Sequence, residues 1–301
     1  MANIQSICKA LVVLVFIAGI SGCDKIDPPY KKKGGGTGTG TTDTTKFIRK
    51  ILIEDYTGHT CPNCPNAAAM LTKLADTIYK GRIIGMAVHC SSLAAPTGSP
   101  FTYDFRTSEG TTYDNFADFQ ISSNGLPYGM LNRLTYQGSK AIPHTDWASV
   151  ITDPANKYMD ANGQWTDPDV GIKLTNTYDV GARTITCKAD VKFLNSMLGN
   201  YKLCILYTED SIVKPQKMPA GVSPSTNLTY VHMHALRGSL TGDAWGYAIP
   251  VADPAKDYTY SKTTSAVTIK TDAVSKYCRV IAFVYNDATK EVVQVEEKSF
   301  Q

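Results

Sequence analysis

The sequence predicts two kinds of fold in one chain, an α/β domain over residues 47–160 and an all-β domain over residues 168–301. Three observations carry this prediction. In the first part, an apolar strand, a helix with an apolar face and a second strand follow one another. In the second part, roughly six or seven short strand-like segments recur with turn residues between them. The composition, 43% hydrophobic and 19% charged, is typical of a globular chain.

The charge balance argues against a nucleic-acid partner. The chain has 30 Lys and Arg against 27 Asp and Glu, a formal net charge of +3 over 301 residues, and no Arg- or Lys-rich stripe. No Ser/His/Asp arrangement, paired-carboxylate site or nucleotide-binding loop stands out either. We therefore expect no nucleic acid and no organic cofactor.

Residues 1–22 predict an export signal. Leu11–Ala18 is an unbroken apolar run that is far shorter than the roughly 20 residues needed to span a bilayer. Ile20–Cys23 resembles the lipobox of bacterial lipoproteins, which implies that Cys23 is acylated and becomes the mature N-terminus. The lipid would then attach the protein to a membrane. An ordinary secretory signal with an incidental cysteine is the alternative.

The sequence of residues 23–46 predicts a lipidated cysteine followed by a disordered tether. Residues 24–33 are polar with a Pro pair, and residues 34–45 contain only Gly, Thr and Asp. Such a composition buries too little apolar surface to offset the entropy lost on ordering. The folded part is therefore expected to begin at residue 47.

One motif predicts a reactive site. It is Cys61-Pro62-Asn63-Cys64, and it lies where the strand predicted over 47–56 ends and a helix begins. Unpaired N–H groups at a helix N-terminus favour a thiolate over a thiol. The spacing lets the second sulfur attack a mixed disulfide formed on the first. The motif therefore predicts exchange with protein thiols or disulfides, with Cys61 as the nucleophile and Cys64 as the resolving thiol.

These residues resemble the thioredoxin superfamily. The resemblance implies a buried acid six residues before the first cysteine, which is Asp55 here, although strand alternation leaves open whether Asp55 or Glu54 faces the site. It also implies a cis-proline beside the disulfide, for which Pro127 is the best candidate. Residues 91–122 are longer and more polar than the thioredoxin equivalent, so an insertion is expected over the site.

The second half predicts a β-sandwich of immunoglobulin-like type. Arg183–Phe193 alternates apolar and polar side chains, as a half-buried strand does, whereas Tyr201–Tyr207 and Tyr277–Tyr285 are continuous apolar strands. Further strands are expected at 170–176, 228–239, 265–271 and 291–295.

The whole pattern resembles the outer-membrane lipoprotein family named for a twenty-eight-kilodalton member and found in Bacteroides-type bacteria. The resemblance rests on the lipobox, the tether, the CxxC motif, the Gly125-Leu126-Pro127 stretch and the segments YVHMHALR, AWGYA and FVYN. It implies a thioredoxin-like domain and a β-sandwich at the outer membrane, facing the periplasm or the cell surface. It implies a cellular location and a fold, and no particular reaction.

Other interpretations exist for the cysteines and histidines. The CxxC motif also has the spacing of half a zinc site, which His59 or a distant pair of ligands would complete. No second CxxC exists, so we expect no metal. His232 and His234 alternate on a predicted strand and so share a face, which is more typical of surface residues than of metal ligands. The thiols in apolar strands are expected to behave as small buried hydrophobes: Cys90, Cys187, Cys204 and Cys278. The alternative in an exported protein is a disulfide such as Cys187–Cys204, since the sequence leaves the connectivity open.

Two functions from different classes follow. In the first, the protein is a lipid-anchored thiol–disulfide oxidoreductase outside the cytoplasm. In the second, it is a binding lipoprotein whose CxxC is a structural disulfide and whose β-sandwich recognises the ligand. Access distinguishes them: a catalytic Cys61 is exposed with Cys64 shielded, whereas both sulfurs of a structural disulfide are covered.

Overall fold

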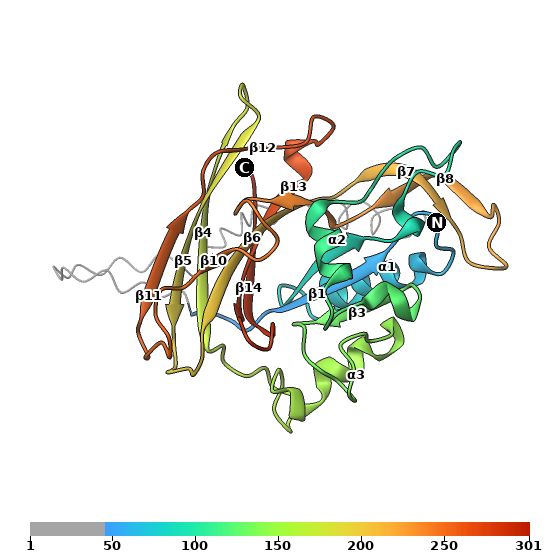
Figure 1. Cartoon of the computed structure of the whole chain (residues 1–301). Helices are drawn as coiled ribbons and strands as arrows, with labels where there is room; N and C mark the ends of the chain where they lie inside the picture. Colours follow the sequence, from blue (N-terminus) through green and yellow to red (C-terminus); the bar gives the residue numbers. More distant parts are fainter. Residues whose placement is uncertain (1–45) are drawn as a thin grey trace, which may run out of the picture. The chain divides into compact units, whose positions relative to one another are not determined.

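The cysteine motif lies in a parallel β-α-β unit, as the apolar pattern predicts (Figure 1). β1 (Ile51–Thr57) pairs in parallel with β2 (Ile83–His89). Between them, α1 (Cys64–Thr72) continues into the π-helical turn η2 (Lys73–Ile78). β3 (Tyr128–Leu131) pairs antiparallel with the other edge of β1. The strand, helix and strand expected from the sequence are therefore confirmed.

The structure is a computed structural model, and it describes residues 46–301. The expected signal peptide (1–22), the acylated Cys23 and the tether up to residue 45 lie outside the described residues.

β1 is buried along its whole length because both of its faces are covered. Ile51 and Ile53 pack into a core that includes Leu71 of α1, while Leu52 and Tyr56 face a second core on the opposite side. A strand covered on both faces needs apolar residues at successive positions rather than alternation. This explains the continuous apolar run in the sequence.

Short helices occur within residues 91–122, where an insertion is expected, and elsewhere in the chain. α2 (Ser108–Asn115) has Thr107 as its N-cap, and the Thr107 side chain accepts a hydrogen bond from the backbone N–H of Gly110 at 3.0 Å. α3 (Trp147–Thr152) follows β3 and contributes the buried Trp147 to the core under α1. Short 3₁₀ turns occupy Ser92–Ala94 (η3), Ile121–Asn124 (η4), His144–Asp146 (η5), Pro154–Asn156 (η6) and Ser275–Tyr277 (η7).

The second half is built from strands. They are β4 (Val170–Asp179), β5 (Thr184–Phe193), β6 (Tyr201–Glu209), β7 (Ile212–Lys217), β8 (Thr226–His232), β9 (Ala235–Ser239), β10 (Tyr247–Ala248), β11 (Thr259–Thr263), β12 (Val267–Thr268), β13 (Cys278–Asn286) and β14 (Val292–Ser299). The protein is therefore of mixed α/β class with a large β-rich part, which confirms the predicted class at that level.

One sheet continues through both halves of the chain. Its strand order is β14-β13-β6-β9-β2-β1-β3, with β10 added on β6. The link is β9, where Ala235 pairs in parallel with Ala87 of β2 and antiparallel with Glu209 of β6. The division into domains at 47–160 and 168–301 stays a prediction, since residues 46–301 form one compact unit whose main sheet crosses that boundary.

A four-stranded sheet of β4, β5, β11 and β12 packs against one face of the large sheet. On β6, Leu203 and Ile205 point into the core shared with this sheet, while Cys204 and Leu206 point into the core on the other face. β6 is thus buried on both sides, as is β13. Their continuous apolar sequences follow from this double burial.

The segment 228–239 is not one strand, and that expectation was wrong. β8 ends at His232 and β9 begins at Ala235. Between them, His234 has a φ of +56°, and its backbone N–H donates to Oδ1 of Asp210 at 2.7 Å. This left-handed residue redirects the chain, so His232 and His234 do not share a strand face. The expected strand at 265–271 is reduced to the two residues of β12.

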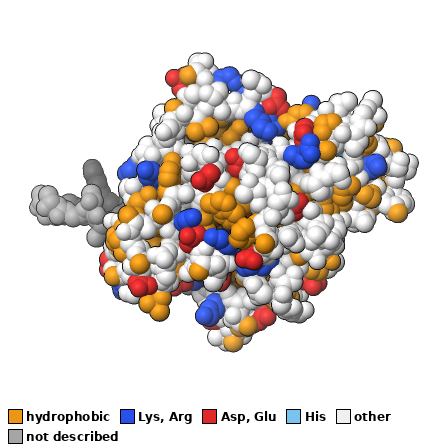
Figure 2. All heavy atoms as spheres, in the orientation of Figure 1, with side chains coloured by type: hydrophobic (Ala, Val, Ile, Leu, Met, Phe, Trp, Pro, Cys, Tyr) orange, Lys and Arg blue, Asp and Glu red, His pale blue; other side chains and the backbone are white. Residues whose placement is uncertain are grey.

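The surface carries both signs of charge. On the face shown in Figure 2, acidic and basic side chains are interspersed among hydrophobic ones, in keeping with the small net charge. Within residues 46–301, no helix is long and apolar enough to cross a membrane.

Candidate functional site

Cys61 and Cys64 form a disulfide at the beginning of α1, with their Cα atoms 5.5 Å apart. The backbone N–H of Cys61 donates to the carbonyl of Gly58 at 3.0 Å, which closes the turn that leads into the helix. Pro65 occupies the first turn of α1, where a missing N–H costs no helical hydrogen bond. The CxxC motif therefore lies at a helix N-terminus, as the sequence predicts.

The segment before β3 lies against Cys61. The carbonyl oxygen of Leu126 is 3.6 Å from Sγ of Cys61, and the Leu126–Pro127 peptide bond is cis. The structure therefore brings Pro127 beside the disulfide, in the cis configuration that the resemblance described above implies.

Alternation along β1 separates the two acidic candidates. Asp55 is buried and lines a cavity together with Cys64. Glu54 points to the opposite face, where its two carboxylate oxygens each accept a 2.8 Å hydrogen bond from the guanidinium of Arg133. Asp55 is thus the acid on the disulfide side of the sheet.

The carboxyl of Asp55 has no compensating partner. Its Oδ1 is buried without a hydrogen bond, and burial raises the pKa of Asp55 well above its usual range. Desolvation penalises the charged form of a carboxyl, so Asp55 holds a proton at a pH where an exposed aspartate is ionised.

The β7–β8 hairpin covers the disulfide. Nε2 of Gln216 donates to the carbonyl of Cys61 at 2.9 Å and to that of Gly58 at 3.4 Å, and the backbone N–H of Lys217 donates to the carbonyl of His59 at 2.9 Å. Cys61 is 2% exposed and Cys64 is 1% exposed. Both sulfurs are therefore covered, which is the arrangement expected of a structural disulfide.

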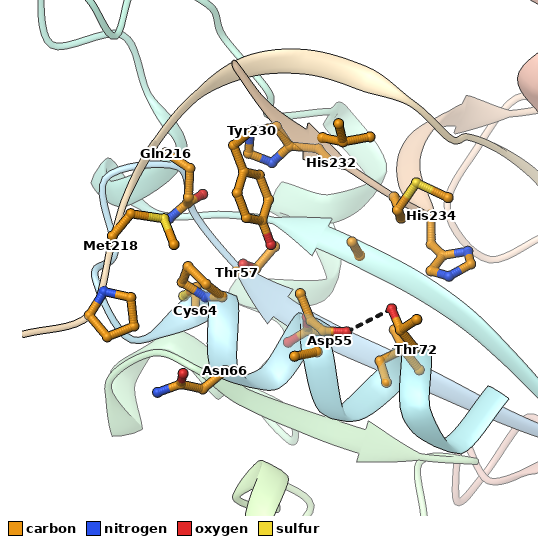
Figure 3. A pocket seen from close by; sticks show the side chains of 18 of the residues that line it. Asp55, Thr57, Cys64, Asn66, Thr72, Gln216, Met218, Tyr230, His232 and His234 are labelled. Carbon is orange, nitrogen blue, oxygen red and sulfur yellow. Dashed lines mark hydrogen bonds between the residues drawn. The ribbon is translucent and has the colours of Figure 1, made fainter. Parts of the chain in front are cut away.

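A cavity of about 380 Å³ lies between α1 and the hairpin. Figure 3 shows Tyr230 reaching from the hairpin towards Thr57, with Cys64 and Asp55 on the opposite wall. Apolar side chains form much of the remaining wall: Pro65, Ala68, Ala69, Leu71, Ala87, Met218, Pro219, Val222, Val231 and Met233. Cys61 does not line this cavity.

Three buried histidines surround Phe105 beside the cavity. Ring centroids of His59, His89 and His232 lie 5.4, 4.3 and 4.5 Å from that of Phe105. Burial lowers the pKa of all three, that of His89 strongly and that of His232 to about 4. They are therefore neutral at pH 7.

Each of these histidines keeps one ring nitrogen without a hydrogen-bond partner, namely Nε2 of His59, Nδ1 of His89 and Nε2 of His232. Among residues 46–301, no three His, Cys, Asp or Glu side chains converge as a metal site. The cluster brings together residues that sequence analysis did not connect, because His59 was considered there only with the CxxC motif and His232 only with His234.

The remaining cysteines that the structure describes are buried free thiols: Cys90, Cys187, Cys204 and Cys278. Cys187 and Cys204 point into different cores, so the disulfide considered for them does not form. Burial raises the pKa of each of these thiols, which favours the unreactive protonated form.

Comparison with known proteins gives a family and a fold. Residues 114–301 match the protein family described as outer membrane protein Omp28, a match that begins after the CxxC motif. Among solved structures, HBP35 of Porphyromonas gingivalis is similar with a TM-score of 0.55 and 16% identity, over 84% of this chain and 76% of that one.

A domain of the outer membrane lipoprotein Omp28 from Porphyromonas gingivalis also matches, with a TM-score of 0.28 and 19% identity, over 44% of this chain and 89% of that one. No curated protein matches the chain. Because the family match covers more than half of the sequence, the chain belongs to the outer membrane protein Omp28 family, and its location is the outer membrane.

Proposed function

We propose that the protein is a thiol–disulfide exchange protein whose α/β part is thioredoxin-like and whose β-rich part is an immunoglobulin-like sandwich. In this proposal Cys61 is the nucleophile, Cys64 the resolving thiol and Asp55 the group that exchanges a proton with them. The β1-α1-β2 unit, the antiparallel β3 and the position of the cysteines at the start of α1 support the proposal.

The observation that carries the proposal is the buried, unpartnered carboxyl of Asp55 in the same cavity as Cys64. An unsatisfied buried polar group costs on the order of 1–3 kcal/mol. A structural disulfide needs no acid in its cavity, so a purely structural role does not explain why this carboxyl is buried without a partner. A carboxyl with a raised pKa in the cavity that a resolving thiol lines has a chemical use, because it is available to take up or supply the proton of Cys64.

The exchange then proceeds in two displacements. In the reduced protein, the Cys61 thiolate, stabilised by the N-terminus of α1, attacks a substrate disulfide and expels one substrate thiolate. With Asp55 ionised, Cys64 loses its proton to this carboxylate and attacks the mixed disulfide at Cys61, which releases the second substrate thiolate and restores the Cys61–Cys64 disulfide. The Leu126 carbonyl beside Cys61 is placed to accept a hydrogen bond from a substrate backbone.

We also propose that the lipid on Cys23 holds this activity at the membrane, so that the partners are the membrane and protein thiols or disulfides. The residue lies outside the described part of the chain, and the support is the sequence Ile20–Cys23 together with the family.

The second candidate is a binding lipoprotein with a structural disulfide. The covering of both sulfurs by the β7–β8 hairpin favours it. In that case the Cys61–Cys64 bond fastens the beginning of α1, and the ligand is recognised elsewhere.

Catalysed reduction of insulin by dithiothreitol separates the two candidates. We expect the protein from residue 46 onward to accelerate this reduction and Cys61→Ser to abolish the acceleration. A wild-type rate equal to that of Cys61→Ser would exclude the exchange function.

A further inference from the structure

The two sulfurs of the disulfide have different surroundings. Sγ of Cys61 faces the Leu126 carbonyl, whereas Cys64 lines the cavity under the hairpin. A molecule inside the cavity therefore meets the disulfide at Cys64.

The cavity has the size of a small-molecule site. Its volume of about 380 Å³ falls within the roughly 300–1,000 Å³ that is typical of such sites. The hairpin and α1 form its walls, so a folded protein cannot place its surface against Cys64 while the hairpin is docked. A low-molecular-weight compound needs no such displacement.

Three polar atoms of residues that line the cavity lack partners within the protein. Asp55, His89 and His232 are each buried to more than nine-tenths, and all three line the cavity. Oδ1 of Asp55, Nδ1 of His89 and Nε2 of His232 make no hydrogen bond. A small molecule that carries hydrogen-bonding groups would satisfy these atoms and recover part of the cost of burying them. The apolar wall suits its carbon skeleton.

We propose that the cavity admits a low-molecular-weight thiol that reduces the disulfide by attack on Cys64. The inference rests on the proposed exchange function and adds to it the class of the electron donor. Protein substrates then react at Cys61, and the small thiol reacts at Cys64, from the other side of the disulfide.

The reaction balances with two molecules of thiol. The first reacts as its thiolate, having released its proton to water. Its sulfur bonds to Sγ of Cys64, and Cys61 leaves with the electron pair and takes up a proton. The second attacks the sulfur of the first, which releases a small disulfide and leaves Cys64 as a thiol that takes up the second proton. Two small thiols are oxidised to one disulfide, and the protein disulfide is reduced to two thiols.

Single-cysteine variants test which sulfur the cavity serves. Cys61→Ser keeps Cys64, and Cys64→Ser keeps Cys61; each is treated with hydroxyethyl disulfide, and the mixed disulfide is followed by mass. Rates are compared per thiolate, from measurements between pH 7 and pH 10. We expect Cys64 to react at least about tenfold faster than Cys61. An equal or faster reaction at Cys61 would overturn the inference.

A matched pair on β8 tests the route. Val231 lines the cavity and is 47% exposed, whereas Leu228 on the same strand is 61% exposed and does not line it. We expect Val231→Trp to slow reduction of the disulfide by 2-mercaptoethanol by about tenfold and Leu228→Trp to leave it unchanged. Equal rates in two folded variants with the same midpoint of thermal unfolding would contradict the route through the cavity.

These outcomes are separate from those for the proposed function. Insulin reduction depends on Cys61, whereas the small-disulfide and 2-mercaptoethanol rates depend on Cys64 and the cavity. A protein that fails to reduce insulin but reacts at Cys64 through the cavity refutes the exchange function alone. One that reduces insulin but excludes small thiols from Cys64 refutes this inference alone.

Discussion

Gln216 donates a hydrogen bond from Nε2 to the carbonyl oxygen of Cys61 at 2.9 Å, across 155 residues of chain. The same amide donates to Gly58, so the β7–β8 hairpin is tied to the loop that positions the first cysteine. The surroundings of the disulfide are therefore built from both halves of the chain.

Gln216→Ala removes this tie. We expect it to lower the free energy of unfolding by about 1–3 kcal/mol, because the buried carbonyl of Cys61 loses its donor and that of Gly58 keeps only the backbone N–H of Cys61. We also expect dithiothreitol to reduce the Cys61–Cys64 disulfide several-fold faster, since the hairpin is held less firmly.

Gln294→Ala is the matched control. Gln294 is also buried, and it also bonds to backbone, accepting from Lys50 and donating to Ile48, but it lies away from the disulfide. It should cost similar stability in urea unfolding without changing the reduction rate. An acceleration as large as that of Gln216→Ala would show that loss of stability alone exposes the disulfide.

Asp55→Asn separates proton transfer from packing. Burial raises the pKa of Asp55, so the folded state holds this proton more tightly than the unfolded state. The resulting stabilisation is present at low pH and lost as the pH rises through the raised pKa. We therefore expect the variant to be more stable than wild type at pH 8 in urea unfolding, with a smaller difference at pH 5, and to reduce insulin more slowly at both. An unchanged rate would remove Asp55 from the mechanism.

The three buried histidines predict a loss of stability in acid. Their pKa values are lowered, so the unfolded state binds more protons, and stability falls as the pH drops below the ordinary histidine value of about 6.5 towards the lowered values. We expect the midpoint of thermal unfolding to fall between pH 7 and pH 5. His232→Phe should flatten this dependence, whereas His144→Asn, outside the cluster, should preserve it. A dependence unchanged in His232→Phe would contradict the assignment.

The Glu54–Arg133 ion pair is fully buried, with both side chains 0% exposed. Arg133 also lies between aromatic rings, with its guanidinium carbon 4.5 Å from the centroid of Tyr113 and 4.9 Å from that of Phe283. Removing one member leaves an uncompensated buried charge, so we expect Glu54→Leu to destabilise by about 3–5 kcal/mol. The double variant Glu54→Leu/Arg133→Met should be less destabilised than Glu54→Leu alone in urea unfolding. Additive losses would show that the two charges do not compensate one another.

Cys23 supplies a prediction about attachment. If the lipobox is used, the full-length protein separates into the detergent phase of Triton X-114, and Cys23→Ala moves it to the aqueous phase. The mass of the mature N-terminal peptide gives an independent readout. Equal partitioning of the two proteins would exclude a lipid on Cys23.

Local sequence signals predicted the region around the disulfide. The apolar pattern identified β1, α1 and β2, whereas Asp55 and Pro127 were named from the resemblance to the thioredoxin superfamily. The inference from the pattern succeeds because strand alternation and helix periodicity act over a few residues.

Those local signals did not predict the β7–β8 hairpin that covers the disulfide. Gln216 lies in a short strand with one proline and mixed polarity, and its partner is far away in sequence. The joining of the two halves rests on β9, which pairs with β2 through a single residue pair, Ala235 with Ala87. Neither feature has a periodicity of its own, because both arise from tertiary packing.

The most direct test of the exchange function is the reduction potential of the Cys61–Cys64 pair. The protein from residue 46 onward is equilibrated with glutathione buffers and alkylated, and the modified thiols are counted by mass, with Cys64→Ser as the control. We predict a value between roughly −120 and −270 mV, the range of working exchange proteins. A value below about −300 mV, together with no mixed disulfide trapped on Cys64→Ser, would contradict the exchange function and identify the pair as a structural disulfide.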